Sequence, residues 1–157
     1  MKIHLFFFRY FLISALMATA GNLTAQTIDL RKAEILASSK IGSPVRETAV
    51  RLLQEEVAKR TSVNLSLSAK LSKIPLIVLA TIKDIEVNGI SVPHRSGENL
   101  PETKAEGYRI FLEDQSGKEI LWLIGADDRG VIFAIGQFLR TAELSKNKIS
   151  FNKINEI

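Results

Sequence analysis

The sequence predicts an α/β (α+β) two-layer sandwich, in which two helices pack on one face of a mixed sheet of about five to six strands. Two segments carry apolar residues at helical spacing, and five others alternate or run apolar in the manner of strands. Their order along the chain is β-α-β-β-β-β-α, followed by a short last strand. A chain of 157 residues is expected to form a single domain.

The first strand and the first helix are predicted from the segment between Ile28 and Thr61. Residues 28–37 alternate imperfectly between apolar and polar, as a strand does. Ser43 and Pro44 then have the pattern of an N-cap followed by proline at the first helical position. The helix is expected to end near Arg60-Thr61. Its apolar stripe is formed by Val45, Ala49, Leu52, Leu53 and Val57.

The remaining strands differ in how much of each face is apolar. Residues 63–67 alternate and predict an edge strand, whereas 75–80 are apolar on both faces and predict a central strand. Residues 108–113 and 119–124 flank a glycine-containing turn and predict a β-hairpin. Residues 149–151 predict a last short edge strand. Residues 83–104 are interpreted as a long polar connection.

The second helix follows directly on the hairpin, in the stretch IGADDRGVIFAIGQFLR from Ile124 to Arg140. Asp127 or Asp128 is expected to cap it by accepting from the N–H groups of its first turn. Its small residues are expected to let the helix approach its neighbours closely: Gly130, Ala134 and Gly136. One apolar stripe is formed by Val131, Ile135, Phe138, Leu139 and Ala142. A second face, which is not plainly solvent-like, carries Arg129, Phe133, Gly136, Gln137 and Arg140.

The chain begins with the pattern of a Sec-type signal peptide over residues 1–25, which has a basic start, an apolar run and a small-residue cleavage site before Gln26. The apolar run is too short for a helix that spans a membrane. The sequence lacks cysteine, so it has no lipobox cysteine and no disulfide. We therefore expect a secreted or periplasmic domain over residues 26–152, followed by a tail over 153–157.

The charge balance and the residue types exclude several classes of function. The 21 basic and 17 acidic residues form no basic block, so no nucleic-acid or membrane partner is expected after signal cleavage. His94 is the one histidine after the signal peptide, and no G-x-S-x-G motif is present. The carboxylates Glu55-Glu56 and the loop residues Glu98 and Glu102 are poorly suited to hold a fixed glycosidase spacing. No catalytic, cofactor-binding or metal-binding residue is predicted, and Trp122 is interpreted as a core or interdomain residue.

Two segments together resemble a known pattern. Glu106-Gly107-Tyr108-x-Ile110 precedes the hairpin, and the helix reads G-A-D-x-R-G-V-x-F-A-x-G-x-x-L-R from Gly125 to Arg140. This order resembles the small α/β domain that precedes the catalytic barrel of bacterial β-N-acetylhexosaminidases and α-glucuronidases. The stretch from Leu52 to Thr61 resembles their first helix, which commonly ends in Arg-Thr-Gly, where this chain has Ser62. Ala134 stands where glycine is commoner.

The resemblance implies an exported accessory domain that has no hydrolytic activity of its own. In those families the catalytic residues lie in the (β/α)8 barrel, so the expected partner is such a barrel, on the same or a separate polypeptide. The second face of the last helix is the expected interdomain interface, through Phe133, Gln137 and Arg140. The alternative is a free-standing periplasmic glycan-binding module that uses Trp122, Tyr108 or the 83–104 loop. A complete enzyme is the third and weakest hypothesis.

Overall fold

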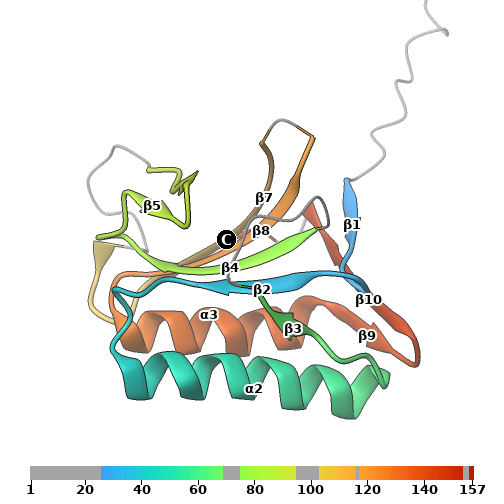
Figure 1. Cartoon of the computed structure of the whole chain (residues 1–157). Helices are drawn as coiled ribbons and strands as arrows, with labels where there is room; N and C mark the ends of the chain where they lie inside the picture. Colours follow the sequence, from blue (N-terminus) through green and yellow to red (C-terminus); the bar gives the residue numbers. More distant parts are fainter. Residues whose placement is uncertain (1–25, 69–74, 95–102, 116, 154–155) are drawn as a thin grey trace, which may run out of the picture.

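The computed structural model describes residues 26–68, 75–94, 103–115, 117–153 and 156–157, so the predicted signal peptide and Glu98 and Glu102 lie outside the described residues. Helices α2 (Ser43–Thr61) and α3 (Asp128–Thr141) lie side by side on one face of a five-stranded sheet (Figure 1). The predicted two-layer α/β arrangement is confirmed. Neither helix is long and apolar enough to cross a membrane, within the part of the chain that is described.

The five-stranded sheet is mixed, as predicted. Its spatial order is β3 (Ser66–Leu67), β2 (Glu34–Ala37), β4 (Leu76–Thr81), β8 (Glu119–Gly125) and β7 (Tyr108–Asp114). The first four are parallel, whereas β7 pairs antiparallel with β8. The predicted central strand is β4, which is buried throughout, and the predicted edge strand is the short β3.

Both faces of the sheet are covered. Alternate side chains of each strand point to opposite sides, so the sheet contributes to two separate cores. The helix face contains Ile77, Leu79, Leu121 and Leu123. The opposite face packs under a small hairpin of β5 (Glu86–Val87) and β6 (Ile90–Ser91). Its core is formed by Leu36, Leu76, Val78, Ala80, Val87, Ile90, Val92, Ile120, Trp122 and Ile124. Residues 86–91, within the predicted polar connection of 83–104, therefore form a hairpin that covers the sheet. The interpretation as a polar connection is wrong for this part of the chain.

The predicted first strand over residues 28–37 is two strands in the structure. β1 (Thr27–Asp29) ends at a turn, and β2 begins at Glu34. The carboxylate of Asp29 accepts the backbone N–H of Arg31 at 3.0 Å and also binds the Arg31 guanidinium. These local bonds stabilise the turn between β1 and β2, which the imperfect alternation of the sequence did not reveal.

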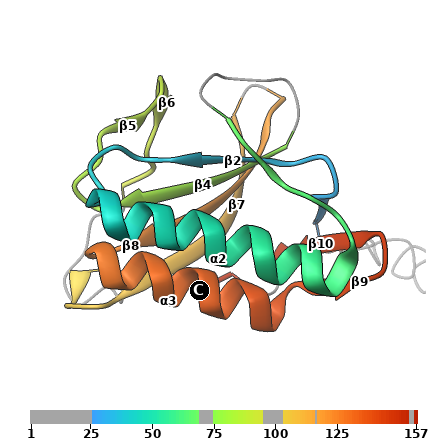
Figure 2. The ribbon, with the colours of Figure 1, turned by 60° about the horizontal axis from the view of Figure 1, so that its bottom comes forward.

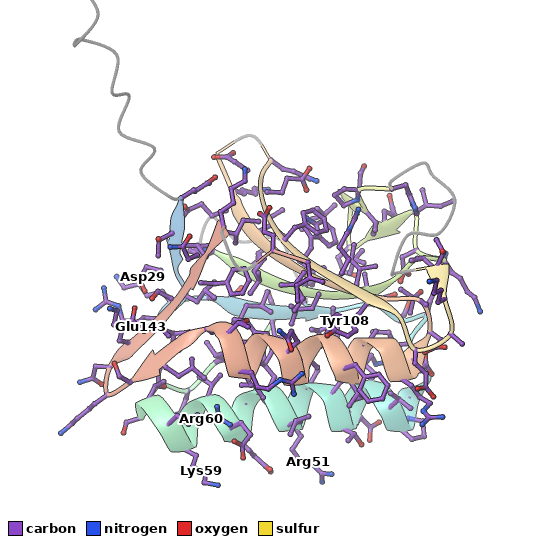
Figure 3. All side chains as sticks on the ribbon, turned by 180° about the vertical axis from the view of Figure 1, so that it is seen from behind. Asp29, Arg51, Lys59, Arg60, Tyr108 and Glu143 are labelled. Atoms are coloured by element: carbon purple, nitrogen blue, oxygen red, sulfur yellow. The ribbon has the colours of Figure 1, made fainter. Side chains whose placement is uncertain are left out.

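The last predicted strand is not an edge. β10 (Lys148–Asn152) lies in the middle of a separate three-stranded sheet, between β1 and β9 (Glu143–Ser145). Asp29 and Glu143 mark this sheet at one end of the molecule (Figure 3). The sheet contributes Phe151, whose ring lies 5.9 Å from that of Phe138, to the core under the helices.

The two helices run in the same direction and contact each other along their length (Figure 2). The buried residues of α2 are Ala49, Val50, Leu53, Val57 and Thr61, so the predicted stripe is confirmed at its centre, whereas Val45 and Leu52 are only partly buried. Its N-cap is Gly42 and not Ser43, and its C-cap is Ser62. Arg60 Nη1 donates to the carbonyl of Leu139 at 2.8 Å and ties α2 to the end of α3.

Candidate functional site

The second face of α3 is the surface that the sequence singles out, and the structure leaves it uncovered. Phe133 is 41% exposed, Gln137 is partly buried and Arg140 is exposed. The Arg140 guanidinium donates to Gln137 Oε1 at 2.7 Å. A single exposed aromatic ring is common on protein surfaces, and Phe133 is the one large apolar residue of α3 that is exposed.

Gly136 lies on this exposed face and not against α2 or the sheet. A Cβ at this position would meet only Arg140 Nη1, at the ordinary contact distance of 3.5 Å. The expectation that Gly136 allows close packing inside the domain is therefore wrong. Its missing side chain leaves helix backbone next to Phe133, with the Arg140 guanidinium as the neighbour within 4 Å.

Gly130, in contrast, is required for packing inside the domain. A Cβ on this residue would lie 2.3 Å from the carbonyl oxygen of Gly107, which real Cβ atoms do not tolerate. The N–H of Ala126 also donates to that carbonyl at 2.8 Å. The start of α3 therefore packs directly on the backbone at the start of β7.

Asp127 holds this junction together and is the N-cap of α3, as predicted. One carboxylate oxygen accepts the N–H of Gly130 at 2.9 Å, and the other accepts the N–H of Glu106 at 3.0 Å. The hydrogen bond from Glu106, and after it the one from Gly130, hold the pKa of Asp127 below its usual value because they favour the charged form. The Glu106 carboxylate pairs with Arg129 at 2.6 Å. The two segments that carried the family resemblance therefore meet at one junction.

Asp128, the second aspartate, connects the two helices. Its Oδ2 accepts the N–H of Gly42, the N-cap of α2, at 3.0 Å. Both aspartates border an open hollow of about 550 Å³ at the carboxyl ends of β4 and β8. It is lined by Lys40, Gly42, Thr81, Lys83, Asp127, Asp128 and Arg129. Ligands often bind at this edge of α/β sheets, but here both carboxylates already accept backbone N–H groups.

A buried carboxylate that the sequence analysis missed lies below this edge. Asp84 is 1% exposed and accepts from Ser38 Oγ at 2.6 Å and from the backbone N–H of Thr81 at 2.7 Å. The bonds join the ends of β2 and β4, so this cluster stabilises the fold. No group of three or more potential metal ligands exists among the described residues.

The aromatic residues considered for sugar binding are placed differently from one another. Trp122 is fully buried, as expected for a core residue, and its indole N–H donates to Glu113 Oε2 at 2.7 Å. Its ring stacks with Phe111 at 6.3 Å, so it presents no face to a sugar. Tyr108 is partly buried beside α3 (Figure 3). His94 is exposed, near the buried Arg109.

Comparison with known proteins supports the fold. No protein-family model and no curated protein matches the chain. Among solved structures, the chain is similar to part of "a novel family GH115 4-O-methyl-alpha-glucuronidase, BtGH115A, with specificity for decorated arabinogalactans". The TM-score is 0.50 at 20% sequence identity, and the match covers 83% of this chain. The chain has the fold of one segment of that enzyme.

The match spans only 17% of the glucuronidase chain. At this identity it establishes a shared fold and not a shared activity. It agrees with the resemblance to an α-glucuronidase domain, which rests on residues 106–110, 124–140 and 52–61. The predicted interface residues Phe133, Gln137 and Arg140 lie on one exposed helix face, but the match does not test their role.

Proposed function

We propose that this chain is an exported, non-catalytic accessory domain of glycoside-hydrolase type, which supports glycan degradation by packing against a catalytic barrel that is absent from the chain. The observation that carries this proposal is the outer face of α3, where exposed Phe133 lies beside the bare backbone of Gly136. The ring of Phe133 and the adjacent backbone of Gly136 together offer a contact surface that another domain could cover. The fold shared with a segment of a GH115 α-glucuronidase supports the choice of partner.

The charges of this face indicate what the partner presents. Arg129 and Arg140 lie at the two ends of the exposed face of α3. Arg129 pairs with Glu106, whereas among the described residues Arg140 donates only to the neutral amide of Gln137. A partner that places a carboxylate against Arg140 would form a charge-assisted hydrogen bond at the rim of an apolar contact. We therefore expect an acidic, partly apolar patch on the barrel.

Site-specific photo-cross-linking tests the proposal. The full chain is expressed in its native host with p-benzoylphenylalanine in place of Phe133, and captured proteins are identified by mass spectrometry. The matched control carries the same group in place of Arg51, an exposed residue that projects from α2 away from the sheet (Figure 3). We expect a glycoside-hydrolase barrel to be captured from position 133 and not from position 51.

A charge-reversal variant adds a second test to the cross-linking experiment. Arg140→Glu in the cross-linking chain should lower the yield of the cross-linked barrel several-fold, because it places two carboxylates together. Lys59→Glu on α2 should leave the yield unchanged. Capture of no glycosidase, or equal capture from positions 133 and 51, would contradict an interface on α3.

The alternative of a glycan-binding module has less support in the structure. Sugar-binding sites stack an aromatic face against the sugar ring, and the indole of Trp122 is fully buried. The accessory-domain proposal expects no heat when chitin or xylan oligosaccharides are titrated into the chain in a calorimeter. A saturable heat signal would favour the glycan-binding module.

A further inference from the structure

The β5–β6 hairpin turns at Asn88-Gly89, and both residues are exposed. Asn88 has φ 49° and Gly89 has φ 81°, in keeping with the two central residues of a type I′ turn. Val87 pairs with Ile90 across the turn. Within the described part of the chain, the N–H of Gly89 donates to no acceptor. The nitrogen of Gly89 is therefore held by no hydrogen bond of the fold.

This dipeptide has the chemistry for a spontaneous rearrangement. The Gly89 nitrogen loses its proton to solvent hydroxide and attacks Cγ of the Asn88 side-chain amide. The N–Cγ bond forms, the Cγ–Nδ2 bond breaks, and ammonia leaves. Water then opens the resulting succinimide, and opening at the backbone carbonyl gives isoaspartate, whose main chain runs through Cβ and Cγ. Because glycine has no Cβ, no side chain hinders the attack.

The turn has to open before the ring can close, because ring closure requires a backbone conformation at Asn88 that a type I′ turn does not have. The hairpin is a separate sheet of two strands, Glu86–Val87 and Ile90–Ser91. An isolated two-stranded hairpin is at best marginally stable. Opening at the tip breaks the short β5–β6 ladder and leaves the five-stranded sheet intact, so it is a local event.

We propose that Asn88 is a modification site, where spontaneous conversion to isoaspartate breaks the turn of the β5–β6 hairpin and loosens its cover over Trp122. Isoaspartate lengthens the main chain, and a two-residue turn matches its strands only at its normal length. Val87 and Ile90 flank the turn, are 2% and 4% exposed, and pack in the same core as Trp122.

The hairpin lies on the face of the sheet opposite α2 and α3 (Figure 1). The modification site is therefore separate from the α3 face of the proposed function, and it requires no partner.

Asn147 provides a matched control within the same chain. It is also exposed, has φ 56°, and lies in the turn between the antiparallel strands β9 and β10. Lys148 follows it, so a side chain hinders attack on its amide. Its N–H also donates to the carbonyl of Thr61 at 2.8 Å, which ties this turn to the end of α2. We therefore expect slower conversion at Asn147 than at Asn88.

The experiment follows both asparagines in the full chain during incubation at mildly alkaline pH and physiological temperature. Peptide mapping by mass spectrometry measures the converted fraction at each site, and electron-transfer fragmentation distinguishes isoaspartate from aspartate. Quenching by acrylamide measures access to the single tryptophan, Trp122, in the same samples. Asn88→Gly is the matched variant, because Gly-Gly also forms this type of turn and has no side-chain amide to convert.

We expect Asn88 to convert at least about tenfold faster than Asn147, because glycine follows it and its hairpin opens locally. Quenching of Trp122 should rise with the isoaspartate fraction in the unsubstituted chain and stay constant in Asn88→Gly. Equal conversion of the two asparagines would overturn Asn88 as the site. Conversion without increased quenching would overturn its effect on the cover of Trp122. Neither result changes what is captured from position 133, so the two proposals fail separately.

Discussion

Four described non-glycine residues have positive φ, and two of them, Glu106 and Ser62, differ in the contacts that offset this left-handed conformation. Glu106, at φ 62°, gains the bond from its N–H to Asp127 and the ion pair with Arg129. Ser62, at φ 63°, caps α2, and its backbone N–H donates to the carbonyl of Ala58. The family pattern commonly has glycine where Ser62 stands, and the structure gives the reason. A left-handed residue costs roughly 1–2 kcal/mol when it carries a Cβ.

We predict that Ser62→Gly stabilises the protein by about 1 kcal/mol, because glycine adopts this conformation without the Cβ clash. The free energy of unfolding is measured in urea, with the fluorescence of the single tryptophan as the signal. Ser62→Ala is the control, since alanine keeps the Cβ and should give no comparable gain. Equal stabilities for the glycine and alanine variants would show that strain at this cap is negligible.

The elements with local sequence signals were predictable, and those that depend on distant contacts were not. α3 and the β7–β8 hairpin carry their periodicity and turn within a few residues. β5 and β6 are too short to show a period, although Asn88-Gly89 between them is a common hairpin turn with positive φ at both residues. That dipeptide was the signal that could have revealed the hairpin.

The candidate site shows the same division. Helical spacing alone placed Phe133, Gln137 and Arg140 on one face of α3. The pairing of Asp84 with Ser38 joins residues 46 positions apart, and the pairing of Gly42 with Asp128 joins residues 86 apart. Periodicity contains no information about contacts of that range, because they depend on how the strands assemble.

The two glycines of α3 predict opposite responses to the same change. Gly130→Ala should destabilise the protein by about 2–3 kcal/mol, because its Cβ would meet the backbone of Gly107. Gly136→Ala should stabilise it by up to about 1 kcal/mol, through higher helix propensity at a position with space. Urea unfolding of both variants measures the difference. A similar loss from both would contradict the open surface at Gly136.

At the scale of the whole molecule, one sheet is shared by two apolar clusters. The central strand β4 and its neighbour β8 contribute to the core under the helices and to the core under the β5–β6 hairpin. Trp122 and Phe138 lie in different clusters, with the sheet between them. Neither cluster can lose its packing while the shared strands remain fully native.

We therefore predict a single cooperative unfolding transition. The fluorescence of Trp122 reports the hairpin side, and the far-ultraviolet circular dichroism at 222 nm reports the helices. The two urea midpoints should coincide, since both cores depend on β4 and β8. Midpoints that differ by more than their experimental error would show that the hairpin side unfolds independently.

The junction of Glu106, Gly107, Asp127 and Gly130 also has a consequence for the order in which the chain assembles. The bond between Glu106 and Asp127 closes a loop of 21 residues, whereas the bond between Gly42 and Asp128 closes one of 86. Closing a shorter loop loses less chain entropy. We therefore expect β7, β8 and α3 to form a nucleus early in folding, on which α2 docks later. The motif on which the resemblance to glycosidase accessory domains rests would then guide the folding pathway as well.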